Sequence, residues 1–336
     1  MTQTNSERPV IHISDVATYL NCRAKWDFTS PLRQSLAPAK PSKHMWLGRM
    51  VHYALAAYYG AGSSTRAAAS LRGAYTSEVL RSLGHIKEEL GYVPEDLKEF
   101  AQLGMDVLNH YALWAPGHDH FTVIMPEVPL KVTRSTYDFA GQTDGLVQDL
   151  RGDLWLLEHK TSSRIPAEPL VAMAYQGQAY VWAARKDPAL ANVGFIKGIM
   201  YNFLYKVPPT KPDVLATGGL SRRRNLRSTP EAYLALVRAK GLDPDDYAEF
   251  VSLLPKDLFF RRYLITYSDE QLQIFEHSLE AIVGEIINRP AIYPQDALRT
   301  CPGCEFTELC RARFSGQLYN DMLEEYSVSE YYKEDA

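Results

Sequence analysis

The chain has 336 residues, 46% of them hydrophobic, and its formal net charge is −4 because 36 lysines and arginines are outweighed by 40 aspartates and glutamates. This length and apolar content predict either one large packed domain or a core with a smaller lobe. The acidic balance excludes a protein that coats nucleic acid with general positive charge. No apolar run approaches membrane-spanning length, and residues 1–9 are too polar for a signal peptide. We therefore expect a cytoplasmic protein that has no membrane partner.

The residue pattern predicts several helices, then a sheet, then a final helix. A flexible N-terminus, residues 1–13, precedes a helix that Ser14 can cap and that carries Cys22 near its end. The capping box Ser268-x2-Gln271 starts the last helix. The expected helices are 14–26, 45–59, 65–83, 94–114, 169–185 and 268–288. The expected strands are 122–132, 137–149, 153–160 and 195–205.

Two acids are symmetrically placed about a short polar turn. Asp144 and Glu158 are equidistant from Arg151, so a hairpin closed at Arg151 places them opposite each other, within about 5 Å on one face. Because side chains alternate along a strand, Glu158 and Lys160 share a face while His159 points away. This set could bind a divalent metal ion together with a water or a phosphate. The alternative is a surface hairpin with an ordinary glutamate–lysine pair.

The four cysteines are a second signal, because three of them are clustered. Cys301, Cys304 and Cys310 form a C-x2-C-x5-C pattern, and Cys22 stands alone near the N-terminus. Thiolates at this spacing suit a tetrahedral metal ion or an iron–sulfur cluster, with Cys22 as the fourth ligand. Structural zinc, two disulfides and unliganded thiols are the alternatives. Disulfides are disfavoured in a cytosolic chain of this size. The cysteine spacing does not distinguish a zinc site from an iron–sulfur cluster.

Two further segments carry weaker signals. Residues 207–262 are long for a connection between core elements, which indicates an insertion. This segment contains the basic run Arg222-Arg223-Arg224, which is either a phosphate-contacting loop or a solvated surface run. The acidic, tyrosine-rich tail, residues 316–336, is expected to carry little fixed structure, although it could dock on the body of the protein or on a partner.

The ordered set of motifs resembles a known nuclease family. The motifs are Gly48-x3-His52, Thr143-Asp144-Gly145, Glu158-His159-Lys160, Gln176-x3-Tyr180 and the one-plus-three cysteines. Together they resemble the RecB-like branch of the PD-(D/E)XK nuclease superfamily, and specifically its iron–sulfur members, which are the CRISPR-associated four-cysteine exonucleases and their phage-encoded relatives. Thr143 stands where the superfamily's name has proline, which RecB-like members often lack.

The resemblance implies a fold and a domain organisation. It implies an α/β, restriction-endonuclease-like core, in which a mixed sheet is flanked by helices. The nuclease domain would cover residues 14–315, with 207–262 as an insertion and 316–336 as the acidic tail. Residues 301–310 and Cys22 would join the N- and C-terminal segments at a four-cysteine cluster, expected to be [4Fe-4S].

The resemblance also implies an activity, a metal-dependent DNA exonuclease that hydrolyses phosphodiester bonds. Asp144 and Glu158, with His52 and the backbone carbonyl of His159, would hold one or two Mg²⁺ or Mn²⁺ ions. These ions would acidify a water molecule and stabilise charge on the scissile phosphate, while Lys160 would orient or help to deprotonate that water. The reaction would serve DNA recombination, repair or phage DNA processing in a bacterial or phage-infected cell.

Other interpretations of the same residues remain open. Gln176 and Tyr180 would line the DNA path in this family, but they also fit an ordinary amphipathic helix. The fold could serve a non-catalytic DNA-binding or recombination-accessory module, although the joint presence of the acids and Lys160 argues against a decayed site. The chain could also be the end-trimming subunit of a CRISPR integration complex. The expected partners are single-stranded or end-containing duplex DNA, and a second copy or a recombination protein.

Overall fold

The computed structural model describes residues 8–38, 40–61, 64–288 and 290–328. Within these residues, six strands form one mixed sheet in the order β1-β4-β5-β6-β7, with β3 also paired to β4. Strands β1 and β4, and strands β5 and β6, are parallel, whereas the other neighbours are antiparallel. The strands are β1 (Val10–His12), β3 (Phe121–Thr133), β4 (Asp138–Asp149), β5 (Leu154–Ser162), β6 (Ile196–Tyr205) and β7 (Phe260–Thr266).

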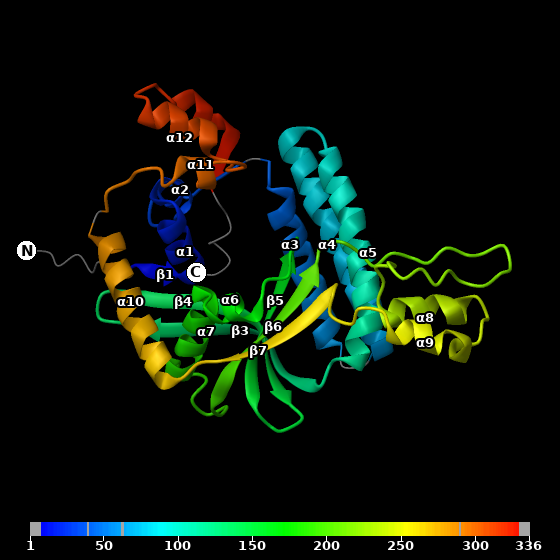
Figure 1. Cartoon of the computed structure of the whole chain (residues 1–336). Coiled ribbons are helices and arrows are strands. Elements are labelled where there is room, and N and C mark those ends of the chain that lie inside the picture. The colour runs from blue at the N-terminus through cyan, green and yellow to red at the C-terminus, as the bar shows by residue number, and fades with distance from the viewer. Residues whose placement is uncertain (1–7, 39, 62–63, 289, 329–336) are drawn as a thin grey trace, which may run out of the picture.

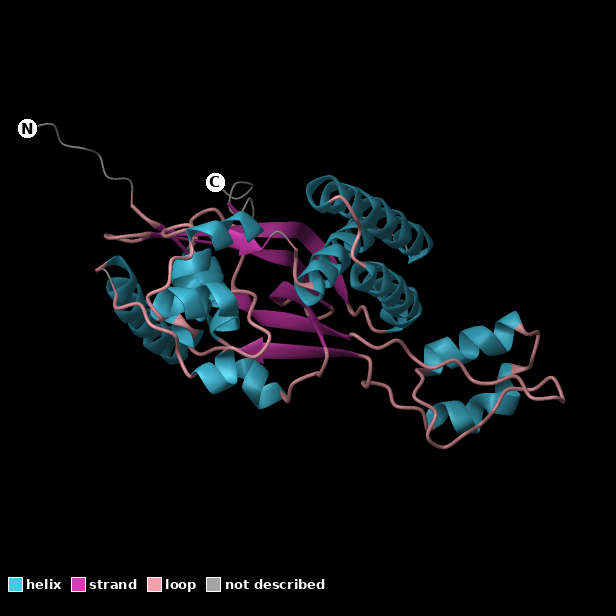
Figure 2. Cartoon of the chain, turned by 90° about the horizontal axis from the view of Figure 1, so that it is seen from above, coloured by secondary structure: helices cyan, strands magenta, loops and turns pink. Residues whose placement is uncertain are grey.

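Helices cover both faces of this sheet (Figures 1 and 2). Helix α7 packs against β3, β4 and β6, with α10 and α1 behind it, whereas α3 packs on β3 and β5 and carries α4 and α5. The mixed α/β fold class is therefore confirmed. The helices are α1 (Ile13–Asn21), α2 (Arg23–Thr29), α3 (Lys43–Gly60), α4 (Ser64–Leu90), α5 (Glu95–Trp114), α6 (Glu168–Ala172), α7 (Tyr175–Lys186), α8 (Pro230–Ala239), α9 (Ala248–Ser252), α10 (Asp269–Ile287), α11 (Ala297–Thr300) and α12 (Thr307–Phe314).

Strand β5 is buried on both faces, as its continuous apolar run indicates. Leu156 belongs to the core that α7 covers, whereas Trp155 and Leu157 pack on the other face with Val147. Because neighbouring side chains on β5 enter different cores, the strand has one fixed register. The polar residues that follow Leu157 are thereby assigned to defined faces.

Two expected helices are each divided in two. The helix expected at 14–26 breaks at Cys22, whose backbone is extended, and its N-cap is His12 rather than Ser14. The helix expected at 169–185 consists of α6 and α7, separated by Met173 and Ala174. The capping box at Ser268 is confirmed at the start of α10.

Residues between β6 and β7 form a lobe that projects from the sheet beside α5 (Figures 1 and 2). We call residues 206–259 the projecting lobe. It contains α8, α9 and a hydrophobic cluster of its own, which includes Tyr233, Val237 and Tyr247. The sequence analysis extended this segment to residue 262, but residues 260–262 belong to β7 and therefore to the six-stranded sheet.

Both ends of the described chain are more ordered than the sequence indicated. Residues 10–12, which were placed in a flexible N-terminus, form β1 and pair with β4. In the acidic tail, Asn320–Glu325 forms a 3₁₀ helix and β8 (Tyr326–Val328) pairs antiparallel with β2 (Leu36–Pro38). Residues 1–7 and 329–336 lie outside the described residues. No helix in the described part of the chain is long and apolar enough to cross a bilayer.

Candidate active site

The hairpin of β4 and β5 places Asp144 next to the backbone of β5. The register pairs Gly145 with Leu157, which confirms that Asp144 and Glu158 stand opposite each other, one residue beyond the last paired residues. There, the N–H of His159 donates to Asp144 Oδ2 at 2.6 Å. The carboxylate of Asp144 thus continues the connection between the strands at the point where their backbone pairing ends.

Helix α3 brings His52 to the other oxygen of Asp144. The His52 Nδ1 and Asp144 Oδ1 atoms are 2.9 Å apart, and the side chains are 33% and 21% exposed. Because an ionised carboxylate only accepts hydrogen bonds, Nδ1 carries a proton, and in the neutral imidazole the Nε2 lone pair is available to a ligand. The side chain of His52 is therefore partly open to solvent, and its hydrogen bond to Asp144 fixes its orientation.

Glu158, Lys160, Gln176 and Tyr180 form one polar cluster between β5 and α7. Lys160 Nζ donates to Glu158 Oε1 and to Gln176 Oε1, each at 2.6 Å. Gln176 Nε2 donates to Glu158 Oε1 at 3.2 Å and to the Tyr180 hydroxyl at 3.0 Å. Gln176 thus contacts each of the other three members, and its amide fixes the positions of the acid and the lysine together.

The electrostatic environment shifts the pKa values of Asp144 and Glu158 in opposite directions. Burial alone would raise the pKa of Asp144, but His52 and the His159 N–H outweigh burial and lower it. Burial raises the pKa of Glu158, and Lys160 only partly opposes this effect. Burial favours neutral His52, yet the charge of Asp144 prevails and raises the pKa of that imidazole. The pKa values of the two acids are therefore shifted apart, with that of Asp144 lowered and that of Glu158 raised.

His159 points to the opposite face of β5, as the alternation of the strand predicted. Its Nδ1 lies 2.9 Å from Asn202 Nδ2 on β6, and its ring stacks on Tyr59 with 5.4 Å between the ring centroids. Burial lowers the pKa of His159 to about 3, so the ring is neutral. Asn202 also accepts from Arg262 Nε at 3.3 Å.

Sequence reasoning missed Asn202 and Arg262. Residues 260–266 combine aromatic and β-branched residues, a composition that is typical of a strand. That signal could have placed Arg262 in the sheet rather than in the insertion. Asn202 had no local signal, because its importance depends on which strands are neighbours.

The donor set suits a hard divalent cation. Two carboxylates and one imidazole are ligands that Mg²⁺ and Mn²⁺ accept. In this arrangement each acid already has a protein partner, His52 and the His159 N–H for Asp144, and Lys160 for Glu158. Accordingly, no three Asp, Glu, His or Cys side chains in the described ranges are grouped closely enough to hold one ion.

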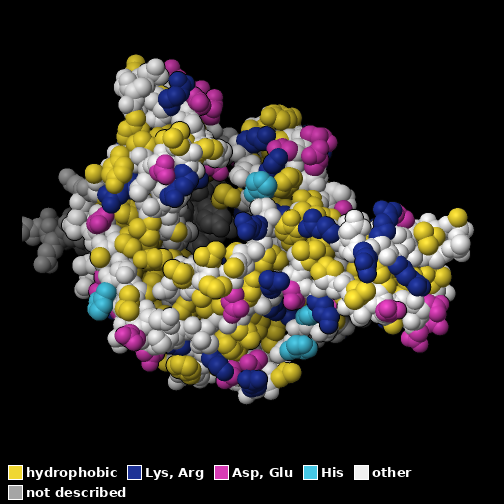
Figure 3. All heavy atoms as spheres, in the orientation of Figure 1, with side chains coloured by type: hydrophobic (Ala, Val, Ile, Leu, Met, Phe, Trp, Pro, Cys, Tyr) yellow, Lys and Arg dark blue, Asp and Glu magenta, His cyan; other side chains and the backbone are white. Residues whose placement is uncertain are grey.

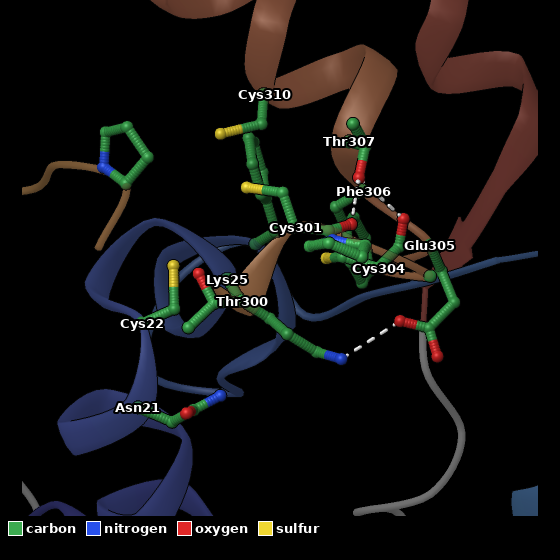
Figure 4. Close-up of a pocket in the computed structure, with 14 residues that line it drawn as sticks. Asn21, Cys22, Lys25, Thr300, Cys301, Cys304, Glu305, Phe306, Thr307 and Cys310 are labelled. Atoms are coloured by element: carbon green, nitrogen blue, oxygen red, sulfur yellow. Dashed lines mark hydrogen bonds and ion pairs between the residues drawn. The ribbon is translucent and has the colours of Figure 1, made fainter. Parts of the chain in front are cut away.

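The four cysteines line one cavity of about 150 Å³. In Figure 4 the sulfur atoms of Cys22, Cys301 and Cys310 point toward a common space between the end of α1 and the segment of α11 and α12. All four are free thiols, and burial raises the pKa of Cys310 to about 11.

Several contacts join the two chain segments around this cavity. Lys25 pairs with Glu305 at 2.9 Å, and Phe28 stacks on Phe306. The buried carboxylate of Asp27 accepts from Arg313 at 2.7 Å. The N-terminal helix α2 is therefore attached to the C-terminal segment by contacts that do not involve a metal.

The basic run Arg222-Arg223-Arg224 lies on the projecting lobe and does not belong to the polar cluster between β5 and α7. Arg222 lies over the ring of Tyr247 at 4.5 Å, Arg223 pairs with Asp213, and Arg224 is exposed. Figure 3 shows lysine and arginine side chains on the lobe and where it joins the rest of the molecule.

Comparison with known proteins identifies one family. The model of the PD-(D/E)XK nuclease superfamily matches residues 12–311, which include both acids, Lys160 and the cysteines. None of the curated proteins matches the chain.

Substitution of the two acids is expected to have opposite effects on the stability of the metal-free protein. Glu158→Gln should raise the free energy of unfolding at pH 7, because ionising Glu158 in the folded state is unfavourable, and the gain should vanish below pH 4.5, the ordinary pKa. Asp144→Asn should lower it at pH 7, because the lowered pKa of Asp144 contributes stability above its ordinary value of 3.8. Urea titrations in EDTA at pH 7 and pH 4 measure both effects, and changes of the same sign would contradict this assignment.

Proposed function

The chain belongs to the PD-(D/E)XK nuclease superfamily, and on that premise we propose that it is a metal-dependent DNA exonuclease of the RecB-like, iron–sulfur branch. It hydrolyses phosphodiester bonds in DNA recombination, repair or phage DNA processing, in the cytoplasm of a bacterial or phage-infected cell. The observation that carries the proposal is the contact of Lys160 with both Glu158 and Gln176, opposite the ionised Asp144.

Asp144, Glu158, His52 and the backbone carbonyl of His159 are the proposed ligands of Mg²⁺ or Mn²⁺. A bound ion supplies an acidified water molecule and stabilises negative charge on the phosphate. Asp144 is ready for this role because it is already ionised. Burial raises the pKa of Glu158, and the Lys160 ammonium partly opposes that rise.

Lys160 is the proposed group that orients the attacking water and counters negative charge on the phosphate. Its ammonium reaches both Glu158 and the amide oxygen of Gln176. The hydrogen bond to Gln176 holds Lys160 in place beside Glu158. Gln176 and Tyr180 therefore position Lys160, in addition to their proposed place along the DNA path.

The projecting lobe is the proposed contact for the DNA backbone away from the reacting phosphate. Arg222, Arg223 and Arg224 provide three guanidinium groups in a chain whose overall charge is negative. Local positive charge of this kind attracts phosphates without coating the whole surface. The substrate is single-stranded DNA or a duplex with an end, and the enzyme acts as a single chain, as a homo-oligomer or beside a recombination partner.

The cysteine cavity is the proposed site of a structural [4Fe-4S] cluster, with structural Zn²⁺ as the alternative. The fit rests on the four free thiols that surround one cavity. A bound cluster would replace the thiol protons and hold the thiolates. It would add to the contacts of Lys25 and Asp27 in closing the chain ends around the nuclease core.

A cleavage assay on end-labelled single- and double-stranded DNA tests the activity. Wild-type protein purified without oxygen should cleave DNA only with Mg²⁺ or Mn²⁺, and Lys160→Ala should reduce kcat/KM at least about 100-fold. Products from each labelled end report the polarity of digestion. Lys186→Ala, at the far end of α7, is the matched control and should retain cleavage. If neither wild type nor variant cleaves while both bind DNA, the non-catalytic binding module is the better interpretation.

The lobe is tested by the salt dependence of DNA binding. Replacing Arg222, Arg223 and Arg224 with alanine should reduce the slope of log K against log salt by about 2, since each lost phosphate contact contributes roughly 0.7–0.9. The control replaces three exposed basic residues of the same lobe, Arg238, Lys240 and Lys256. An equal reduction in the control would show that only general charge matters.

The cluster is tested by metal analysis of anaerobically purified protein. We expect about four iron atoms per chain and visible absorption, both absent from Cys304→Ser. The variant should also melt at a lower temperature and bind DNA more weakly, because the chain ends lose one of their connections. Zinc in place of iron would establish the alternative cofactor. A variant that loses its metal yet keeps its melting temperature and activity would contradict a structural role.

A further inference from the structure

One turn of helix α3 lies directly beside the candidate active site. A β-carbon added to Gly48 would lie 3.5 Å from Thr161 Oγ1 on β5, so the helix and the strand are in contact at this point. One turn later, the side chain of His52 reaches Asp144. The segment of α3 from Gly48 to His52 therefore borders the end of β5 that carries the proposed reacting groups.

Next to this segment, α3 presents a row of exposed side chains. Met45, Arg49 and Tyr53 are spaced four residues apart, and all three are exposed to solvent, Met45 by 64% and Tyr53 by 53%. Side chains three or four residues apart are neighbours on a helix, with about 5–6 Å between their β-carbons. Arg49 is therefore a neighbour of His52 as well as of Tyr53. We call Met45, Arg49 and Tyr53 the exposed row of α3.

The guanidinium of Arg49 is unpaired. Within the part of the chain that the structure describes, it has no hydrogen bond, no ion pair and no aromatic ring beneath it. Other arginines, such as Arg33, Arg185 and Arg262, each bind a carboxylate. Both oxygens of Asp144 already accept hydrogen bonds from other groups. All the donors of Arg49 are therefore available to an anion from solution.

Further basic side chains lead from α3 to the projecting lobe. Lys206, the first residue of the lobe, donates from Nζ to the carbonyl of His44 in the first turn of α3, at 3.3 Å. Arg227 is exposed, and its guanidinium lies 6.0 Å from the ring centroid of Tyr205, the last residue of β6. Positive charges therefore continue from the exposed row of α3, past the end of β6, to the lobe that carries the arginine run.

This combination of groups matches the chemistry of a nucleic acid strand. Guanidinium groups bind phosphates through paired hydrogen bonds. An exposed aromatic ring offers a stacking surface, and only an unpaired base can use it, because the bases of a duplex already stack on one another. Tyr53 is such a ring, since it contacts no other ring in the described part of the chain.

We propose that the exposed row of α3 binds single-stranded DNA, with Arg49 on a phosphate next to the reacting one and Tyr53 under an unpaired base. From there the strand passes Lys206 and Arg227 to the projecting lobe. The inference deepens the proposed function and rests on it, because that function places the reacting phosphate at Lys160. It also goes further, since it makes Tyr53 the residue that favours single strands over duplex.

The contact of Arg49 is tested by fluorescence anisotropy with a dye-labelled single strand, in EDTA so that no cleavage occurs. Arg49→Ala should reduce the slope of log K against log salt by about 0.7, the contribution of one phosphate contact on a single strand. Arg49→Lys keeps the charge and should keep the slope. The matched control is Arg66→Ala, which removes an exposed arginine of α4 and should leave the slope unchanged.

The contact of Tyr53 is tested with the same single strand and with a blunt duplex of the same sequence. Tyr53→Ala should weaken binding of the single strand at least about fivefold, and binding of the duplex less than about twofold. Tyr53→Phe keeps the ring and should bind as the wild type does. Tyr92→Ala, which removes an exposed tyrosine between α4 and α5, is the control and should change neither affinity.

Every outcome decides the inference. An unchanged slope in Arg49→Ala, or an equal reduction in Arg66→Ala, would overturn the phosphate contact. An equal loss of single strand and duplex in Tyr53→Ala would overturn the selection of single strands, and a wild type that binds no single strand would overturn both. If the binding results hold but Mg²⁺ and Mn²⁺ support no cleavage, the proposed nuclease activity fails and the exposed row remains a single-strand site. Cleavage that persists with unaltered binding in both variants would retain that activity and refute the inference.

Discussion

The hydrogen bond from the His159 N–H to Asp144 is the interaction on which the site depends. A buried carboxylate is costly unless it is paired. Asp144 is paired at both oxygens, once by the backbone of β5 and once by His52 from α3. These two contacts bring a helix and two strands to a common point. The position of every other proposed ligand follows from this point, because Glu158 and Lys160 are the next residues on either side of His159.

The two faces of strand β5 lie in different chemical environments. On one face, Glu158 and Lys160 meet Gln176 in a cluster whose ammonium is held by two hydrogen bonds and is partly open to solvent. On the other face, His159 enters a buried network that ends at Arg262. Alternation along a strand normally separates core from solvent. Here it separates a partly exposed cluster of ionisable groups from a buried hydrogen-bond network.

Much of this arrangement was predictable from local sequence. The symmetric spacing of Asp144 and Glu158 about Arg151 correctly predicted the hairpin and its register as far as Gly145 and Leu157, and the alternation rule correctly placed His159 on the opposite face. The break at Cys22 was not predictable, because it depends on packing rather than on helix propensity. Arg262 was assigned to the insertion although the composition of residues 260–266 indicates a strand, whereas no local pattern reveals that this strand lies beside β6. The four thiols were expected together, and a shared cavity does bring them together, although their cofactor stays a proposal.

The attachment of α2 to the C-terminal segment has a consequence for biosynthesis. Phe28 packs in one hydrophobic cluster with Phe306 and Leu309, and Asp27 obtains one of its two arginine partners from Arg313, 286 positions later in the chain. These partners are synthesised long after α2. The sheet can begin to assemble during translation, whereas α2 must wait with an exposed aromatic ring and an incompletely neutralised carboxylate. Synthesis of residues 306–313 is therefore the step that permits this part of the native structure to close.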